Sequence, residues 1–300
     1  MRLIKQLLVL AVLLAAPFAG WAAEGGESVG LPLAAPVIFD LGWFKVTNSM
    51  LVMAVVALSL IVFVQMATRN IQRVPQGLQN FAEWIVESLS GFLAGIMGEK
   101  LVRQTFWFFF TVFLFIITAN WFGLLPGVGT IGWGTPDDTG HLHHISSPIL
   151  RGANADLNMT LALAITFFAC WIFWSIKANG IGGFFSHIFV YHGDATGPLR
   201  LLLMVMFFLV GFLEVISIMI RPVTLNFRLF GNVFAGETLL ETMLHLGGNF
   251  GWLAALPFYG LELMVGAIQA LVFTLLTAVF TALMCRHDEE HAETAEGAHH

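Results

Sequence analysis

An arginine inside an apolar segment is the residue of this chain whose chemistry is easiest to name. Arg228 lies in the stretch Phe227-Arg-Leu-Phe-Gly-Asn232, and a guanidinium keeps its proton at every physiological pH. A permanent charge at bilayer depth costs about 2.5 kcal/mol or more, so such a residue is a candidate functional group. Carboxylates lie in the neighbouring apolar sequence, at Glu214, Glu237, Glu241 and Glu262. This combination indicates the wall of a path for a small cation, most simply a proton.

The spacing of the polar residues before Arg228 predicts a shared helix face. Glu214, Arg221 and Arg228 follow one another at intervals of seven residues, and seven residues turn a helix by about 700°, close to two full turns. The three side chains share one face if the segment is one continuous helix, and Asn232 follows one turn later. Pro222 removes one backbone hydrogen bond and invites a bend. Arg221 has two simpler interpretations, as a structural partner of Glu214 or as a side chain that snorkels to the membrane interface.

A second polar stripe lies in the last apolar segment. Glu262 and Gln269 are again seven residues apart, and the Gln269 amide offers both donors and acceptors. We expect Gln269 to face Arg228, because facing polar stripes on two apolar helices produce a water-containing crevice. The alternative for Glu237 and Glu262 is a purely structural role.

The composition predicts an all-α, multi-pass membrane protein. Of the 300 residues, 58% are hydrophobic and 11% are charged, whereas soluble domains carry about 25% charged residues. The two cysteines, Cys170 and Cys285, form neither a disulfide framework nor a metal-binding spacing. No basic patch indicates a nucleic-acid partner, and no motif indicates a cofactor or a metal.

Charge-free stretches predict five membrane helices, and the chain as a whole divides into four regions. The spans lie at residues 46–68, 105–125, 157–176, 201–245 and 252–285, and the last two are long enough to form a tilted, bent or broken hairpin. Residues 1–23 have the features of a cleaved signal peptide, with an uncleaved anchor as the alternative. The remaining regions are an external N-terminal segment (24–45), an integral membrane proton-channel domain (46–286) and an acidic cytoplasmic tail (287–300).

Basic residues between the spans predict the orientation. They gather in two connections, at Arg69, Arg73, Lys100 and Arg103 and at Lys177 and Arg200. Positively charged connections stay in the cytoplasm, so the mature N-terminus is expected outside and the C-terminus inside. The connection before Leu157 holds Arg151 and several aspartates and is expected to be external.

Within the first cytoplasmic connection, apolar residues recur at helical spacing. They are Leu78, Phe81, Ile85, Leu89, Phe92 and Ile96. The pattern predicts an amphipathic helix. Such a helix either lies on the membrane surface or packs on other parts of the protein.

Four motifs carry a resemblance to a known family. The longest is Arg228-Leu-Phe-Gly-Asn-x-x-Ala-Gly-Glu237, followed by an apolar helix with Gln269. Upstream lie Asn120-x-x-Gly-Leu-Leu-Pro126, Ala155-Asp-Leu-Asn-Met-Thr160 and Ser175-Ile-Lys-x-Asn-Gly-Ile-Gly-Gly183. Over roughly residues 40–286 the chain resembles subunit a of the F-type ATP synthase.

The resemblance implies a membrane subunit that is not itself catalytic. It forms two half-channels beside the ring of c subunits and couples proton flow to ring rotation and ATP synthesis, in a bacterial plasma membrane and with peripheral-stalk subunit b as a second partner. The resemblance implies that Arg228 is the arginine that faces the ring, with Asn232 and Gln269 as its polar neighbours. It also implies that Glu237 and Glu262 line the external half-channel and that Glu214 lies toward the cytoplasmic half-channel.

Three other classes of protein are weaker interpretations. A secondary transporter predicts two related halves with paired broken helices, and the sequence has neither. A haem-binding redox protein predicts histidines on facing spans, whereas His141, His143 and His144 lie in a connection, where metal binding is the alternative to a solvated loop. If the protein were a structural assembly factor, the charge of Arg228 in an apolar segment would have no explanation. The choice between H⁺ and Na⁺ as the coupling ion stays open.

Overall fold

The computed structural model describes residues 35–40, 42, 45–125, 128, 132–133, 147–148, 151–189, 198–246 and 250–285. The expected signal peptide (1–23), the acidic tail (287–300) and the histidines at 141, 143 and 144 lie outside the described residues. All structural statements below concern the described part of the chain.

Five helices are long and apolar enough to cross a membrane, which confirms the all-α, multi-pass architecture. They are α2 (Asn48–Thr68), α4 (Glu99–Gly123), α5 (Leu157–Phe189), α6 (Pro198–Leu246) and α7 (Gly251–Cys285). A sixth helix, α3 (Leu78–Met97), joins α2 to α4 at the position of the expected amphipathic helix.

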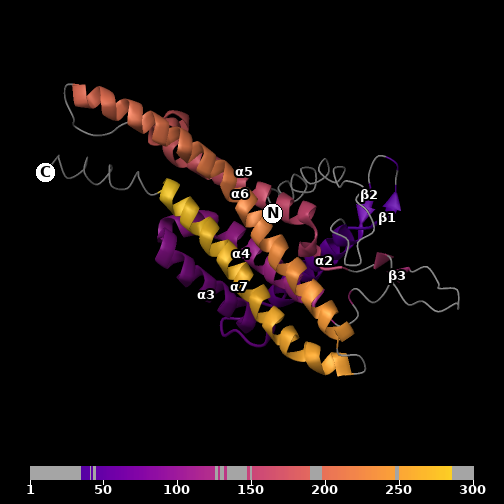
Figure 1. The fold of residues 1–300 in the computed structure, drawn as a ribbon. Helices are drawn as coiled ribbons and strands as arrows, with labels where there is room; N and C mark the ends of the chain where they lie inside the picture. Colours follow the sequence, from indigo (N-terminus) through magenta and orange to yellow (C-terminus); the bar gives the residue numbers. More distant parts are fainter. Residues whose placement is uncertain are drawn as a thin grey trace.

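Short strands, which the sequence analysis did not anticipate, lie between the helices. β1 (Val37–Asp40) pairs with β2 (Lys45–Thr47), and β3 (Gly132–Trp133) pairs with β4 (Ser147–Pro148), both antiparallel. A 3₁₀ turn, η2 (Ala153–Ala155), precedes α5. In Figure 1, β1, β2 and β3 lie at the end of the bundle where α6 ends and α7 begins, away from the start of α6 and the end of α7.

The last two membrane helices are long and lie side by side (Figure 1). α6 has 49 residues and α7 has 35, which correspond to about 74 Å and 52 Å of helix. A hydrocarbon core of about 30 Å is much thinner, so the pair must tilt or extend beyond it. Pro222 lies inside α6 and Pro257 inside α7, and neither proline ends its helix.

Aromatic side chains build the core between α4, α5 and α7. The Phe108 ring lies 5.3 Å from that of Trp174, and Phe167 and Phe273 are also buried. The indole N–H of Trp171 donates to the carbonyl of Phe280 over 3.1 Å. These contacts fix α7 against a rigid support, because large aromatic side chains bury the most apolar area.

The amphipathic helix α3 is packed on protein along part of its length, and the remainder is exposed. Leu89, Leu93 and Met97 are buried in the core that α3 shares with α4 and α7, whereas Phe81 and Trp84 are exposed. Its second half therefore packs on protein. Its first half leaves an apolar surface of the kind that a membrane interface covers.

α5 is longer than the sequence predicted. The expected span ends at Ile176, but the helix continues to Phe189 across a break at Gly180, whose φ is 70°. Glycine has no Cβ to clash at positive φ. The backbone is therefore non-helical at Gly180, and the chain bends there between two helical segments.

One buried hydrogen bond between α5 and α6 gives a stability prediction. The Thr160 hydroxyl donates to the side-chain oxygen of Asn226, and both residues are buried. Thr160→Val should lower stability by about 1 kcal/mol and should couple to Asn226→Leu in a double-mutant cycle. The measurement is heat- or detergent-induced dissociation of the purified assembly. Thr166→Val is the control, because Thr166 donates to Ala162 in its own helix. An equal loss of stability in Thr160→Val and Thr166→Val, with no coupling between Thr160→Val and Asn226→Leu, would contradict this role.

Candidate functional site

The predicted polar face of α6 exists, and its first two members pair with each other. Arg221 Nη2 lies 2.9 Å from Glu214 Oε1, and the Arg221 guanidinium also lies 4.7 Å from the centre of the Phe280 ring on α7. Arg221 thus has an acid on its own helix and an aromatic face on the next. This geometry agrees with the interpretation of Arg221 as a structural partner of Glu214.

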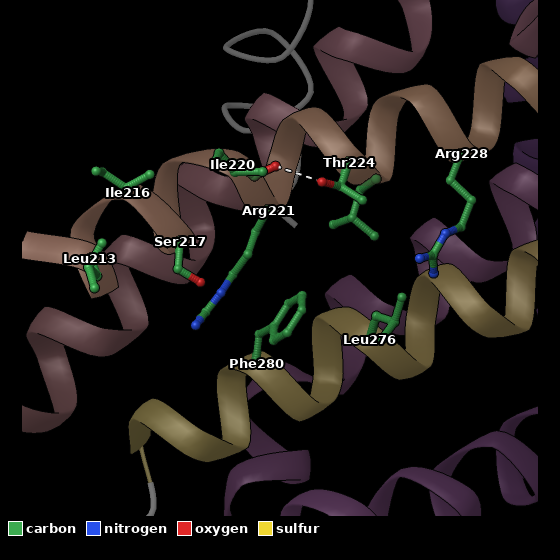
Figure 2. A pocket seen from close by; sticks show the side chains of 10 residues that line it. Leu213, Ile216, Ser217, Ile220, Arg221, Thr224, Arg228, Leu276 and Phe280 are labelled. Carbon is green, nitrogen blue, oxygen red and sulfur yellow. Dashed lines mark hydrogen bonds between the residues drawn. The ribbon is translucent and has the colours of Figure 1, made fainter. Parts of the chain in front are cut away.

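An open groove of about 490 Å³ runs between α6 and α7 from Arg221 to Arg228. Figure 2 shows both guanidinium groups directed from α6 toward α7, with Phe280 near Arg221 and Leu276 between the two arginines along the groove. The rest of the lining is mostly apolar: Leu213, Ile216, Ser217, Ile220, Thr224 and Leu225. Charge enters this apolar groove only through the two arginines.

Arg228 differs from Arg221 in its surroundings. The side chain is exposed, and no carboxylate of the described residues lies within 4.0 Å of it. The chain therefore presents this permanent charge on its surface instead of neutralising it. In an apolar medium an uncompensated cation is costly, so this position favours a neighbouring anion or water.

One helical turn beyond Arg228, α6 and α7 are joined through two amides. Asn232 Nδ2 donates to Gln269 Oε1 over 2.8 Å, and Gln269 is buried. The expected facing of polar stripes is therefore present, with Asn232 instead of Arg228 as the hydrogen-bond partner of Gln269. Gln269 Nε2 is buried without a hydrogen-bond acceptor among the described residues, so one donor remains available there.

A small, partly open cavity, called here the outer chamber, is lined by two of the predicted carboxylates. Its volume is about 40 Å³, and it is lined by Asn120, Gly123, Leu124, Val233, Glu237, Leu240, Tyr259 and Glu262. A polar cavity of this size has room for water. Glu237 from α6 and Glu262 from α7 thus share a chamber in which a proton can be exchanged between carboxylates and water.

Two glycines make the space that these carboxylates occupy. A Cβ added at Gly236 would lie 2.1 Å from the Glu262 carboxyl carbon, and a Cβ added at Gly152 would lie 2.6 Å from Glu237 Oε1. Both distances are far below van der Waals contact. The positions of the two carboxyl groups therefore depend on glycine at positions 152 and 236.

Arg151, to which the sequence analysis gave no role, proves to be buried beside the outer chamber. Its side chain is 3% exposed, and its Nε lies 3.5 Å from Glu237 Oε2. The expected external, solvated connection thus sends a cation into the protein interior. No periodic pattern links residues 151 and 237. The only sequence signal for this contact is a cation close to the polar start of a helix.

Asp156 adds a further buried carboxylate next to this arginine. Burial raises the pKa of Asp156, while a hydrogen bond from the Asn158 backbone, the charge of Arg151 and a hydrogen bond from Ser49 act in the opposite direction. Asp156 Oδ1 also accepts the Asn158 N–H over 3.0 Å, which caps the start of α5.

Amide side chains brace the walls of the chamber. Asn120 Nδ2 donates to the Gly266 carbonyl over 3.0 Å, and Asn154 Nδ2 donates to Asn120 Oδ1 over 2.7 Å. The Trp121 N–H donates to the Leu263 carbonyl over 3.1 Å. These bonds join α4, η2 and α7 around the same polar site.

The described residues contain no group of three or more metal-ligating side chains. Neither Cys170 nor Cys285 forms a disulfide. The polar groups that the site does contain are carboxylates, which can exchange protons, and amide and guanidinium groups, which can orient them.

Comparison with known proteins agrees with the motif around Arg228. The family model described as ATP synthase A chain matches residues 50–282. ATP synthase subunit a of Gloeobacter violaceus is 33% identical over 245 residues, covering 81% of this chain and 86% of the relative. The subunit a of Solidesulfovibrio magneticus is 32% identical over 258 residues (86% and 91%), and that of Campylobacter jejuni subsp. doylei is 33% identical over 228 residues (76% and 85%). This chain belongs to the ATP synthase A chain family.

Proposed function

We propose that the protein is the proton-conducting stator subunit of a bacterial F-type ATP synthase. It forms two half-channels beside the c-ring and is not catalytic on its own. The observation that carries this proposal is the placement of Arg228: an exposed guanidinium on the α6 face, with an open groove on one side along the helix and the carboxylates of the outer chamber on the other.

The external half-channel leads through the outer chamber. Protons reach Glu262 and Glu237 through water in the cavity and pass along the face that carries Asn232 and Gln269. Carboxylates suit this task because each can accept a proton from water and return it. A single water molecule or amide group between two carboxylates is enough to relay the proton from one to the other.

The cytoplasmic half-channel follows the groove past Arg221 and Glu214. The groove is open, and Glu214 is 46% exposed even though it pairs with Arg221. A half-exposed carboxylate at the mouth of a groove can exchange protons with the solution. Glu214 therefore serves the side opposite to Glu237 and Glu262.

Arg228 separates the two paths and acts on the carboxylates of the ring. A ring carboxylate must be neutral while it faces lipid, because an ionised carboxylate is costly there. Beside a guanidinium the ionised form is favoured, so the proton leaves into one half-channel and a new one arrives from the other. Each proton that crosses the potential releases about 2.3 kcal/mol per 100 mV, which biases rotation.

The remaining parts of the proposal concern the surroundings of the subunit. The c-ring lies against the α6–α7 face with Arg228, peripheral-stalk subunit b is a further partner, and lipid covers the other apolar faces. The subunit lies in the plasma membrane with its N-terminus outside and its C-terminus in the cytoplasm, as the basic connections indicate.

Replacement of Arg228 tests the proposal directly. Arg228→Ala should abolish ATP-driven proton pumping, because no fixed cation then drives the ring carboxylates to ionise. Passive proton leak through the membrane sector should rise, because the electrostatic barrier between the half-channels is gone. The measurements are pH-gradient formation in inverted vesicles and proton conductance after removal of the soluble sector. Full coupled pumping in this variant would contradict the proposal.

The lysine variant asks whether charge alone is enough. Arg228→Lys should lose most of the pumping rate, about tenfold or more, because an ammonium lacks the planar fork of donors and can lose its proton when water is removed. The same vesicle assay measures the rate. Pumping equal to that of the unmodified complex would show that a guanidinium is not required.

Glu262 provides a test of the external path alone. Glu262→Gln should slow proton uptake from the external side, because an amide cannot accept and release the proton, while the amount of assembled complex stays the same. ATP synthesis driven by acid pulses of graded pH measures the uptake. Normal rates over the whole pH range would remove Glu262 from the path.

A further inference from the structure

We propose that Arg151 is a positioning residue of the outer chamber: its buried guanidinium holds the Glu237 carboxylate in place and sets the charge balance at the chamber wall. This inference rests on the proposed function and adds a second arginine to it. It gives a role to the segment before α5, which contributes neither a ring-facing side chain nor a lining residue of the groove.

The first support is geometric. Arg151 is 3% exposed, and its Nε lies 3.5 Å from Oε2 of Glu237, a residue that lines the chamber. The neighbouring backbone N–H of Gly152 faces the same carboxylate. Two consecutive residues of one segment therefore fix the orientation of a side chain that α6 supplies.

The second support is the identity of residue 152. Gly152 has φ −50° and ψ 127°, a backbone conformation that any residue adopts. Glycine matters there for a different reason, because a Cβ would lie 2.6 Å from Glu237 Oε1 and the carboxylate would have to move away. The local sequence Arg151-Gly152 thus combines a cation that attracts the Glu237 carboxylate with the empty space that admits it.

The third support is the balance of charge around the chamber. Its titratable lining residues are Glu237 from α6 and Glu262 and Tyr259 from α7, and α4 contributes the uncharged Asn120. Asp156, just before α5, does not line the chamber but interacts with Arg151, and Ser49 of α2 donates a hydrogen bond to Asp156. Arg151 is the cation that the described residues place next to these carboxylates. Its permanent charge offsets the repulsion among them and makes ionisation of a carboxylate in the chamber less costly.

The experiment compares three variants of the complete complex in membranes. Arg151→Gln removes the charge, Arg151→Lys keeps it, and Gly152→Ala leaves Arg151 intact but fills the space of the Glu237 carboxylate. Arg103→Gln is the matched control, because Arg103 is exposed on α4 and takes no part in the proposed path. The readouts are the amount of subunit in the complex, ATP-driven pumping, and the pH profile of passive proton conductance.

Arg151→Gln should lower pumping about tenfold or more and move the conductance profile to higher pH by about one unit or more. The sign follows from electrostatics: a nearby cation favours the ionised form, so removing it favours the protonated form of a facing carboxylate such as Asp156. Arg151→Lys should restore the parental pH profile and much of the rate. Gly152→Ala should lower pumping although every charge remains. Arg103→Gln should behave like the parent.

Specific outcomes would overturn the inference. A slow Arg151→Gln variant with an unchanged pH profile would mean that Arg151 only stabilises the fold. If the Arg151→Gln variant does not assemble, the Arg151→Lys and Gly152→Ala variants test the inference instead. Pumping at the parental rate in Gly152→Ala, together with no activity in Arg151→Lys, would refute the inference. Failure of the proposed function is separate, because it is measured by Arg228→Ala in a chain whose Arg151 is unchanged.

Discussion

The cost of a charge in an apolar medium governs how this molecule is built. Two arginines next to the α6–α7 pair have a carboxylate of the chain beside them, Glu214 for Arg221 and Glu237 for Arg151. Arg228 is exposed and has no such partner within 4.0 Å among the described residues. Because the membrane penalises an isolated cation, the proposed function assigns the missing anion to a carboxylate of the ring.

The same glycines determine how closely the chain segments approach and where the carboxylates lie. Gly236 allows Glu262 of α7 to lie against α6, and Gly152 allows Glu237 of α6 to lie against the segment before α5. The Asn232–Gln269 hydrogen bond then holds α6 and α7 together between these carboxylates and Arg228. A small change in helix separation would therefore move the carboxylates, so the aromatic packing behind α7 is also a condition for the geometry of the site.

Periodic features of this architecture could be predicted from the sequence, whereas contacts between distant segments could not. The five spans, the shared face of Glu214 and Arg221 and the polar stripe with Gln269 follow from apolar length and a spacing of seven, which are local properties of a helix. The Arg151–Glu237 pair joins residues with no common periodicity. No local pattern indicated the short strands. The third span was ended at Ile176 because a charge-free stretch stops before Lys177, whereas helical structure continues on both sides of the kink at Gly180.

The two regions on either side of Arg228 differ in a way that bears on direction. On one side the groove is open and mostly apolar, with about 490 Å³ of space; on the other the chamber is smaller and less open, with about 40 Å³, and two carboxylates line it. Under the proposed function, protons on the chamber side move through carboxylates and few waters, whereas the open side needs a second surface to confine its water. In this proposal the ring is that surface. The subunit alone then contains one half-channel that is largely built and one that is completed by the ring, and a proton crosses the membrane by riding on the ring past Arg228.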